Sequence, residues 1–288
     1  MSGSDNLRGA LLMMVAMLAF TAGDGVMKLL TQSVPLTQAM FLRGVLTTTG
    51  LLLIAHLTGT LTSKVPSGDR IFLVLRSLAE VSCSVLFFMA LMRMPLANAT
   101  AIMQTVPLTV TLAGFVFLGE PVGWRRMAAI ALGFIGMLMV IQPGGGDFNL
   151  WSLLAVASML LVVLRDLVTR RMSSTLPTTT IAVYTSATVT LGSLAGAWVE
   201  GWGPVTGSAV WLIPLAASTL LIGYITIVAT MRTGELGFVA PFRYTALFWA
   251  LLLGWWLFDT LPNRLAIAGG ALVAMTGIYT LWRERTRR

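Results

Sequence analysis

Several charged side chains stand inside long apolar segments, where each could bind a polar ligand. Arg43 and Arg76 are two of them, and Glu80 follows Arg76 by four positions, on the same face of a helix. A charge inside a membrane span costs about 2.5–3.5 kcal/mol, so such side chains usually face a bundle interior or a wet cavity. An arginine can donate two parallel hydrogen bonds to a carboxylate or a phosphate. We therefore expect these residues to bind a small charged substrate, although Arg76 and Glu80 could instead form a structural ion pair.

Residues 237–254 place a proline and an arginine in the first third of an apolar run. Pro241 removes a backbone donor, and in a helix it leaves the carbonyl of Gly237 without its usual partner. At helical spacing Arg243 shares a face with small residues, which indicates a lined groove rather than a lipid-facing surface. The alternative is an arginine that extends to the nearby membrane interface. Arg243 is thus a further candidate for substrate binding.

Aromatic side chains inside the apolar runs could stack on a flat ligand. Tyr224, Tyr244 and Trp249 are candidates of this kind, but an aromatic residue within a span more often serves packing. A metal site is not expected, because the chain has one cysteine, Cys83, and one histidine, His56. A membrane-embedded enzyme would need a cluster of nucleophile, acid and base, and none occurs at a recognisable spacing.

The composition is that of an all-α integral membrane protein. Of the 288 residues, 57% are hydrophobic and 10% are charged, and the mean hydropathy is +0.86. Ten apolar runs of membrane-spanning length are separated by turn-rich or charged breaks. The predicted spans cover residues 9–30, 36–57, 71–92, 96–118, 124–142, 150–170, 178–199, 209–231, 236–258 and 264–282.

The first half of the chain recurs in the second half. A shift of 142 residues aligns the first run with the sixth, and a shift of 139 aligns the fourth run with the ninth. This duplication predicts two five-helix repeats, over residues 1–142 and 149–288, joined by a turn at 143–148. Because five is odd, the second repeat must enter the membrane with the opposite polarity. Inverted repeats recur in secondary transporters, which bind substrate near the midplane between the halves.

The duplication separates the charged residues into two groups. Asp24 with Lys28 recurs as Asp166 with Arg170, and each pair is spaced to neutralise itself on one helix face, so we expect these residues to be architectural. By contrast, the arginines and the glutamate chosen above have no charged counterpart in the other repeat. Since a substrate is rarely symmetric, we expect residues that break the symmetry to recognise it.

The distribution of lysine and arginine predicts the orientation of the chain. Twelve of them fall on the N-terminal side of the membrane and three on the other side, which places both termini in the cytoplasm. The net charge of +8 could suggest nucleic acid as a partner. No basic stripe occupies a soluble face, however, so nucleic-acid binding is not expected.

Short motifs carry a family resemblance. GEP at 119–121 opens the turn before the fifth run, and the small-residue run LGFIGMLMVI occupies 132–141. Together with the duplicated ten-run pattern, they make the chain resemble the EamA family of the drug/metabolite transporter superfamily over essentially its whole length. Within that family, FLRG at 41–44, LRS at 75–77, the QPGGGDFN turn and APFRY at 240–244 are similar to bacterial S-adenosylmethionine uptake carriers.

The resemblance implies a secondary transporter that moves a small polar metabolite across the bacterial inner membrane by alternating access. It implies a central cavity between the repeats, with neither an ATP site nor a bound cofactor. Uptake of an S-adenosylmethionine-like cargo is the first expectation, and riboflavin uptake or efflux of amino acids or other metabolites is the alternative. A non-transporting membrane scaffold or sensor is the alternative from another class. The expected partners are a small-molecule substrate and the lipid bilayer, with a homodimer left open.

Overall fold

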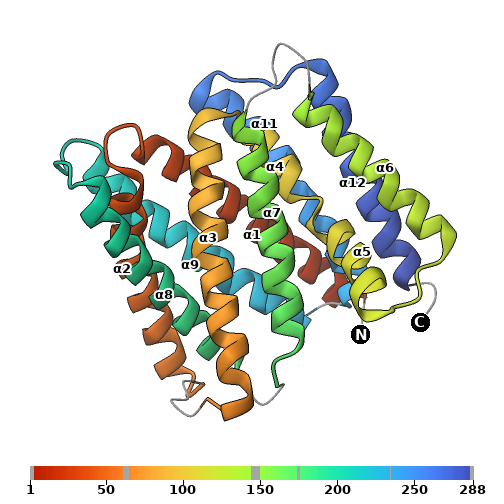
Figure 1. The fold of residues 1–288 in the computed structure, drawn as a ribbon, viewed down its shortest axis with the longest axis horizontal. Helices are drawn as coiled ribbons and strands as arrows, with labels where there is room; N and C mark the ends of the chain where they lie inside the picture. The colour runs from red at the N-terminus through yellow and green to blue at the C-terminus, as the bar shows by residue number, and fades with distance from the viewer. Residues whose placement is uncertain (1–2, 61–64, 144–149, 174–175, 234, 286–288) are drawn as a thin grey trace.

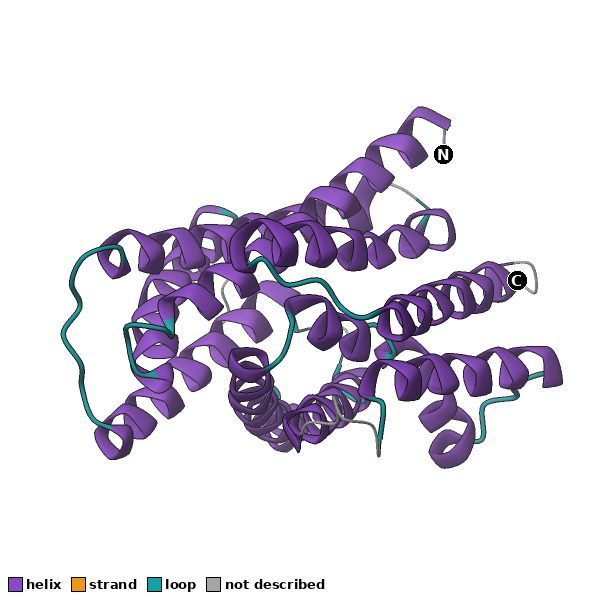
Figure 2. Ribbon diagram, turned by 90° about the horizontal axis from the view of Figure 1, so that it is seen from above, coloured by secondary structure: helices purple, strands orange, loops and turns teal. Residues whose placement is uncertain are grey.

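The computed structural model describes residues 3–60, 65–143, 150–173, 176–233 and 235–285, and every regular element in these ranges is helical (Figure 1). The first half contains α1 (Gly3–Leu30), α2 (Leu36–Leu57), η1 (Ser67–Asp69), α3 (Arg70–Arg93), α4 (Leu96–Met103), α5 (Val106–Leu118) and α6 (Trp124–Ile141). The second half contains α7 (Leu150–Arg170), α8 (Thr178–Glu200), α9 (Ala209–Thr233), α10 (Leu236–Val239), η2 (Ala240–Tyr244), α11 (Thr245–Phe258) and α12 (Arg264–Arg285). Both ends of the chain lie at the same end of the bundle (Figure 2), as an even number of crossings requires.

These helices coincide with the ten predicted runs, which confirms the fold class. Within the described chain, eight segments are long and apolar enough to cross a membrane. The other two runs are the hydroxyl-rich α8 and the divided segment formed by α10, η2 and α11. The predicted connecting turn at 143–148 lies, apart from Pro143, outside the described residues.

Prolines divide the fourth and ninth runs into shorter helices. Pro107, in the first turn of α5, has no N–H to donate to the carbonyl of Met103, and the helix breaks between α4 and α5. Pro241 lies in the tighter 3-10 turn η2, between α10 and α11. From the sequence we expected Pro241 to free the carbonyl of Gly237 but treated both segments as continuous spans, so neither division was predicted.

Helix pairing follows a two-fold pattern between the halves. The most extensive contacts join α1 with α9, α3 with α7, α2 with α8 and α6 with α12, and α4 packs on α11. Exchanging the two halves turns the pair α1–α9 into α7–α3 and turns the pairs α2–α8 and α6–α12 each into itself. This pattern is expected of repeats related by a pseudo-two-fold axis in the membrane plane. The structure is therefore organised as two inverted five-helix repeats.

Two hydrogen bonds locate this axis, because each joins residues at equivalent positions of the two repeats. The hydroxyls of Thr48 in α2 and Thr190 in α8 lie 3.1 Å apart, and Gln104 Nε2 donates to the backbone oxygen of Arg243 at 2.7 Å. Equivalent residues can touch only where the axis passes between them. The backbone of Arg243 therefore lies at the middle depth of the bundle, roughly half of the ~30 Å hydrocarbon core away from either interface.

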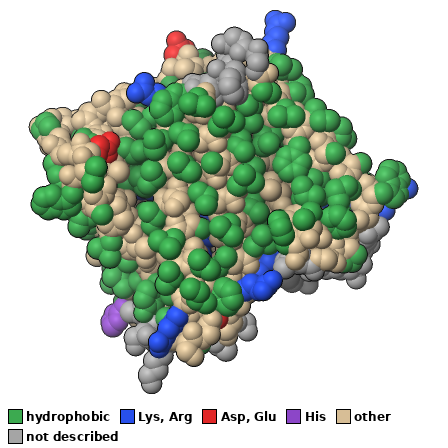
Figure 3. Space-filling model, in the orientation of Figure 1, with side chains coloured by type: hydrophobic (Ala, Val, Ile, Leu, Met, Phe, Trp, Pro, Cys, Tyr) green, Lys and Arg blue, Asp and Glu red, His purple; other side chains and the backbone are tan. Residues whose placement is uncertain are grey.

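The outer surface of the bundle is apolar. Figure 3 shows hydrophobic side chains over most of one face, with Lys and Arg side chains mainly near its rim. Large exposed apolar side chains include Phe117, Trp198 and Trp256, whereas Met27 and Leu91 are fully buried in the core. A helix whose inward and outward faces are both apolar is typical of a protein that is surrounded by a lipid bilayer.

The N-terminus of α2 is held by a carboxylate from the end of α8. Glu200 Oε1 accepts a hydrogen bond from the backbone N–H of Leu36 at 3.2 Å, and Oε2 accepts one from that of Thr37 at 2.8 Å. These N–H groups have no partner within their own helix. We expect Glu200→Ala to cost about 1 kcal/mol, as the loss of a helix cap does, and Glu200→Gln to cost less because one acceptor oxygen remains. The thermal unfolding midpoint of the purified protein in detergent should fall by about 2–4 °C for the alanine variant. An unchanged midpoint would show that water replaces the cap.

Candidate functional site

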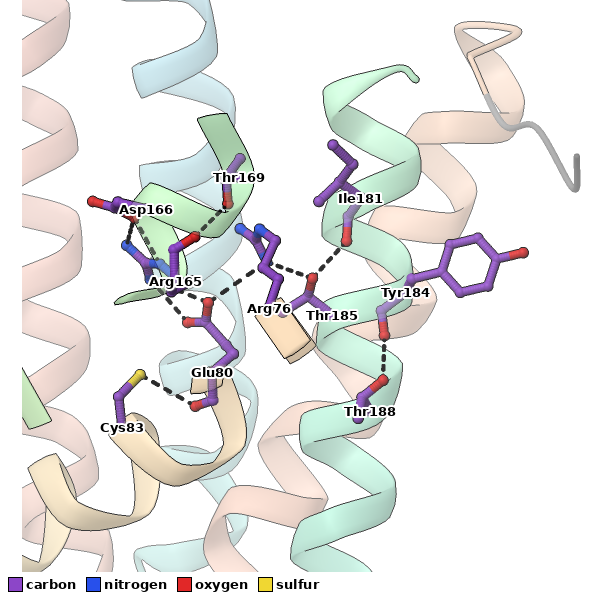
Figure 4. Close-up of polar contacts among 10 residues, drawn as sticks. All are labelled: Arg76, Glu80, Cys83, Arg165, Asp166, Thr169, Ile181, Tyr184, Thr185 and Thr188. Carbon is purple, nitrogen blue, oxygen red and sulfur yellow. Dashed lines mark hydrogen bonds and ion pairs between the residues drawn. The ribbon is translucent and has the colours of Figure 1, made fainter. Parts of the chain in front are cut away.

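A cluster of charges joins α3 and α7 inside the bundle. Arg165 Nη1 donates to both carboxylate oxygens of Glu80, at 3.2 and 3.1 Å. From the other side, Arg76 Nη1 lies 3.7 Å from Glu80 Oε2 and donates to Thr185 Oγ1 at 2.6 Å. Figure 4 shows the two guanidinium groups on either side of the carboxylate. The exposed fractions of the Arg76, Glu80 and Arg165 side chains are 15%, 22% and 23%, so solvent screens the cluster only in part.

Arg165 is the functional candidate that the sequence reasoning missed. It also holds Asp166, whose Oδ1 accepts from Arg165 Nε at 2.9 Å. In the repeat alignment Arg165 falls on Gly23, an uncharged residue, so the criterion of broken symmetry could have identified it. The neighbouring Asp166 does have an acidic counterpart, Asp24, which made this part of α7 look architectural.

The equivalent position in the other half of the fold carries no charge. Glu80 aligns with Thr219, so the pair Arg165–Glu80 between α7 and α3 corresponds to Gly23–Thr219 between α1 and α9. A Cβ added at Gly23 would lie 2.8 Å from Thr219 Oγ1, which shows that these two residues do meet. The same pseudo-symmetric contact is thus ionic in one half and small and neutral in the other.

The charged cluster borders a cavity of about 340 Å³. Four of the residues predicted from the sequence line it, namely Arg43, Arg76, Glu80 and Tyr224, and Arg165 lines it as well. Hydroxyls and apolar side chains complete the wall; they come from Phe20, Thr47, Ser84, Thr185, Ser186, Leu220 and Ile227 among others. The cavity can therefore offer donors to an acidic group, a carboxylate to a cationic group, and two rings to a flat moiety.

Arg43 reaches the same cavity from α2. Its guanidinium carbon lies 5.0 Å from the centre of the Phe88 ring, a cation–π contact. No carboxylate is within ion-pair distance of Arg43 in the described chain. Arg43 therefore keeps its hydrogen-bonding capacity for a ligand.

The remaining three predicted residues lie outside this cavity, on η2 and α11. Tyr244 is 5% exposed, and its hydroxyl lies against Gly277 of α12. Trp249 packs, with Phe20, Phe242 and Ile227, against an apolar cluster of Met13, Ala16, Met17, Val239 and Ala246. Arg243 occupies the middle depth of the bundle beside Gln104. The assignment of all seven residues to substrate binding stays a prediction.

The predicted self-neutralising pairs are not formed in the described structure. Asp166 is held by Arg165 instead, and Arg170 pairs with Glu120 across 3.5 Å. In the first repeat, Lys28 Nζ donates to the backbone oxygen of Met94. The physical reason is that each of these helices packs against neighbouring helices. A charged group or a backbone carbonyl on a neighbouring helix can then bind the side chain in place of the residue one turn away on its own helix.

Metal binding has no support in the described residues. No group of three or more His, Cys, Asp or Glu side chains in these ranges is arranged to hold a metal ion. Cys83 is buried, and its thiol donates to the backbone oxygen of Glu80 at 3.3 Å.

Comparison with known proteins agrees with this arrangement. The chain is 29% identical to a riboflavin transporter of Vibrio cholerae over 196 residues, which cover 67% of this chain and 65% of that protein's length. It is 24% identical to a pseudopaline exporter of Pseudomonas aeruginosa, with 94% of each chain covered, and 22% identical to an S-adenosylmethionine uptake transporter of Rickettsia bellii, with 66% of this chain and 65% of that protein covered. A solved structure titled "Crystal structure of protein" superposes with a TM-score of 0.68 at 19% identity, covering 97% of this chain and 99% of that one, which shows the shared fold.

The family itself is shown by a match over nearly the whole sequence. The model of the EamA-like transporter family matches residues 7–142 and again residues 149–283. The two matches correspond to the two halves that the pseudo-two-fold axis relates, and the cavity lies among helices of both. The chain therefore belongs to the EamA-like transporter family of the drug/metabolite transporter superfamily, as a multi-pass membrane protein.

Proposed function

We propose that the cavity binds a zwitterionic metabolite with a flat ring, and that the protein takes up an S-adenosylmethionine-like cargo across the bacterial inner membrane. The observation that carries this proposal is the charge set around the cavity, which is lined by three guanidinium groups and one carboxylate, Glu80, that two of them share. Arg43 would bind an acidic group of the cargo, because it has no carboxylate at ion-pair distance. Glu80 would approach a cationic group, and Tyr224 would stack on the ring.

S-adenosylmethionine fits this set because it carries a carboxylate, a positive sulfonium and an adenine ring. A relative named as an S-adenosylmethionine uptake transporter supports the cargo, although its identity to this chain is 22%. Riboflavin also has a flat ring, and a riboflavin transporter is among the relatives, at 29% identity. Riboflavin lacks the carboxylate that the arginines favour, so we place it second.

Export is the alternative direction, and one comparison favours it. The pseudopaline exporter matches 94% of this chain and 94% of its own length, a wider match than those of the riboflavin transporter and the S-adenosylmethionine uptake transporter. Inverted repeats allow the cavity to open to either side, so the fold is compatible with both directions. The excess of lysine and arginine on the N-terminal side supports cytoplasmic termini. A homodimer remains a separate proposal, to be tested by the mass of the detergent-solubilised particle.

The cargo can be tested without knowledge of the direction or of a coupling ion. Purified protein is reconstituted in vesicles that contain unlabelled S-adenosylmethionine, and entry of the labelled compound by exchange is followed. We expect exchange that riboflavin competes for weakly. Arg165→Lys should slow it about tenfold or more, because a single ammonium nitrogen cannot hold Glu80 and Asp166 at once as the separate guanidinium nitrogens do.

Arg125→Lys is the matched control, since Arg125 is exposed at the start of α6 and lies outside the cavity. It should exchange like the wild type. Exchange of riboflavin but not of S-adenosylmethionine would make riboflavin the proposed cargo and would leave the proposal of a carrier unchanged. An equal loss of exchange in Arg165→Lys and Arg125→Lys would contradict the proposal that the cavity is the binding site.

A further inference from the structure

We propose that Arg243 forms a second anion-binding site, at the crossing of the two divided segments and separate from the 340 Å³ cavity. The group it binds is a carboxylate or a phosphate, either as part of the cargo or as a free anion that moves with it. The inference concerns binding at Arg243 alone. It does not depend on which metabolite the cavity accepts.

Arg243 differs from the other arginines inside the spans in having no partner for its side chain. Arg165 holds Glu80 and Asp166, Arg76 lies beside Glu80, and Arg43 stacks on Phe88. In the part of the chain that the structure describes, the Arg243 guanidinium makes no hydrogen bond, ion pair or ring contact, and its Nε is buried. A buried donor left without an acceptor is unfavourable, because it has lost its hydrogen bond to water without gaining another.

Arg243 lies too deep in the bundle for its side chain to reach water at a membrane interface easily. The hydrogen bond between Gln104 and the Arg243 backbone places it on the pseudo-two-fold axis, at the middle of the bundle. Neither of the crossing segments, residues 96–118 and 236–258, contains an aspartate or a glutamate. The crossing therefore carries a positive charge without an acidic residue of its own to balance it. Ionisable residues at this depth usually mark a substrate or ion pathway.

The neighbouring polar groups are also donors without partners. The hydroxyl of Tyr244 and Nε1 of Trp249 are buried, and neither has a hydrogen-bond partner in the described ranges. They point to different sides, Tyr244 towards α12 and Trp249 towards the apolar cluster on α1. Arg243 is thus the cationic group of this segment, and no carboxylate on the segment competes with an anion for it.

Arg243 does not line the cavity. Phe242 and Trp249 pack against an apolar cluster that Phe20 and Ile227 also contact, and these last two side chains line the cavity. Because Arg243 is not part of the lining, it can be altered without removing a residue of the cavity.

The pseudo-symmetry offers a sharp test, because Gln104 is the equivalent of Arg243 and the two residues touch. The full-length protein in detergent is titrated by calorimetry with succinate and, separately, with inorganic phosphate. We expect saturable binding that Arg243→Gln weakens about tenfold or more, the loss of one charge-assisted contact. The double variant Gln104→Arg with Arg243→Gln returns the charge to the same crossing from the other helix. It should restore most of the affinity, which a purely local structural role would not allow.

Two further variants keep the proposal open to refutation. Arg243→Lys retains the charge and should bind more weakly than the wild type but better than the glutamine variant, which covers the case that Arg243→Gln does not fold. Arg165→Lys alters the cavity and should leave this binding unchanged. Binding of phosphate alone assigns a free inorganic anion, and binding of succinate alone assigns the acidic group of an organic cargo. Absence of saturable binding, equal binding in Arg243→Gln, or equal loss in Arg165→Lys would overturn the second site.

Discussion

Glu80→Gln is expected to abolish transport and to destabilise the bundle by about 2–3 kcal/mol. The carboxylate is shared by Arg165 at 3.1 Å and Arg76 at 3.7 Å, so the variant leaves two guanidinium groups facing each other across α3 and α7. Removing one partner of a buried ion pair costs about 3–5 kcal/mol. We place the effect lower because the Glu80 side chain is 22% exposed and water can enter. Exchange in vesicles and thermal unfolding in detergent measure the two parts.

Two controls separate the structural loss from the functional one. Glu120→Gln breaks an ion pair of the same kind, with Arg170 at 3.5 Å, but there both side chains are about half exposed. It should cost less than ~1 kcal/mol and leave transport intact. The double variant Glu80→Gln with Arg165→Gln removes both charges of the closer pair. It should regain most of the stability without regaining transport, and recovery of transport in it would show that the pair serves only the fold.

The charged cluster makes the α3–α7 interface chemically different from its pseudo-symmetric counterpart, the α1–α9 interface. In alternating access by inverted repeats, each half adopts in one state the arrangement that its partner adopts in the other. The α3–α7 interface is closed by the Arg165–Glu80 contact, whereas its counterpart between α1 and α9 is closed by Gly23 against Thr219. The two interfaces therefore open against different forces. A charged cargo can compete for the first contact but has nothing to compete for in the second.

Much of the fold was predictable from the sequence because the bilayer permits few solutions. A span must satisfy its own backbone, so length and hydropathy alone define helices such as α1 and α7. The shift of 142 residues that relates them, with an odd number of spans per repeat, then requires inversion. The break at Pro107 was missed because a proline in a helix can be accommodated as a kink without dividing the helix.

The site was predictable in part, for reasons that particular residues illustrate. Arg76 and Glu80 stood out because the other repeat has no charge at their positions, and the structure places both on the cavity. Arg165 met the same criterion but lies next to Asp166, which has a counterpart. The groove expected around Arg243 assumed 100° of rotation per residue, whereas η2 is a 3-10 turn with 120° per residue. Over five residues the expected face is displaced by about 100°, and sequence spacing cannot reveal this.

Gly269→Val is expected to separate α6 from α12 and to lower the stability of the protein by about 3 kcal/mol or more, at or beyond the upper end of overpacking costs. A Cβ at position 269 would lie 2.5 Å from the backbone oxygen of Gly136 and 2.8 Å from Cβ of Met139. The reciprocal contact is equally close, since a Cβ at Gly136 would lie 2.7 Å from the backbone oxygen of Gly269. Backbone atoms cannot turn aside as a side chain does, so the helices themselves must move. Small residues at such crossings are what allows helices to pack closely in a membrane, where apolar surface gives no preference for protein over lipid.

The neighbouring residue supplies the control for this prediction. A Cβ at Gly270 would have one neighbour within 4 Å, Cβ of Ala101 at 3.8 Å, which is ordinary contact. Gly270→Ala should therefore be tolerated, or stabilise the helix by about 0.5–1 kcal/mol, because alanine loses less backbone entropy than glycine. The test is the thermal unfolding midpoint and the monodispersity of Gly269→Ala, Gly269→Val and Gly270→Ala in detergent. We expect the losses to increase with side-chain size at 269 and to be absent at 270. Equal behaviour of the two alanine variants would mean that α6 and α12 are not held at the distance that their glycine contact defines.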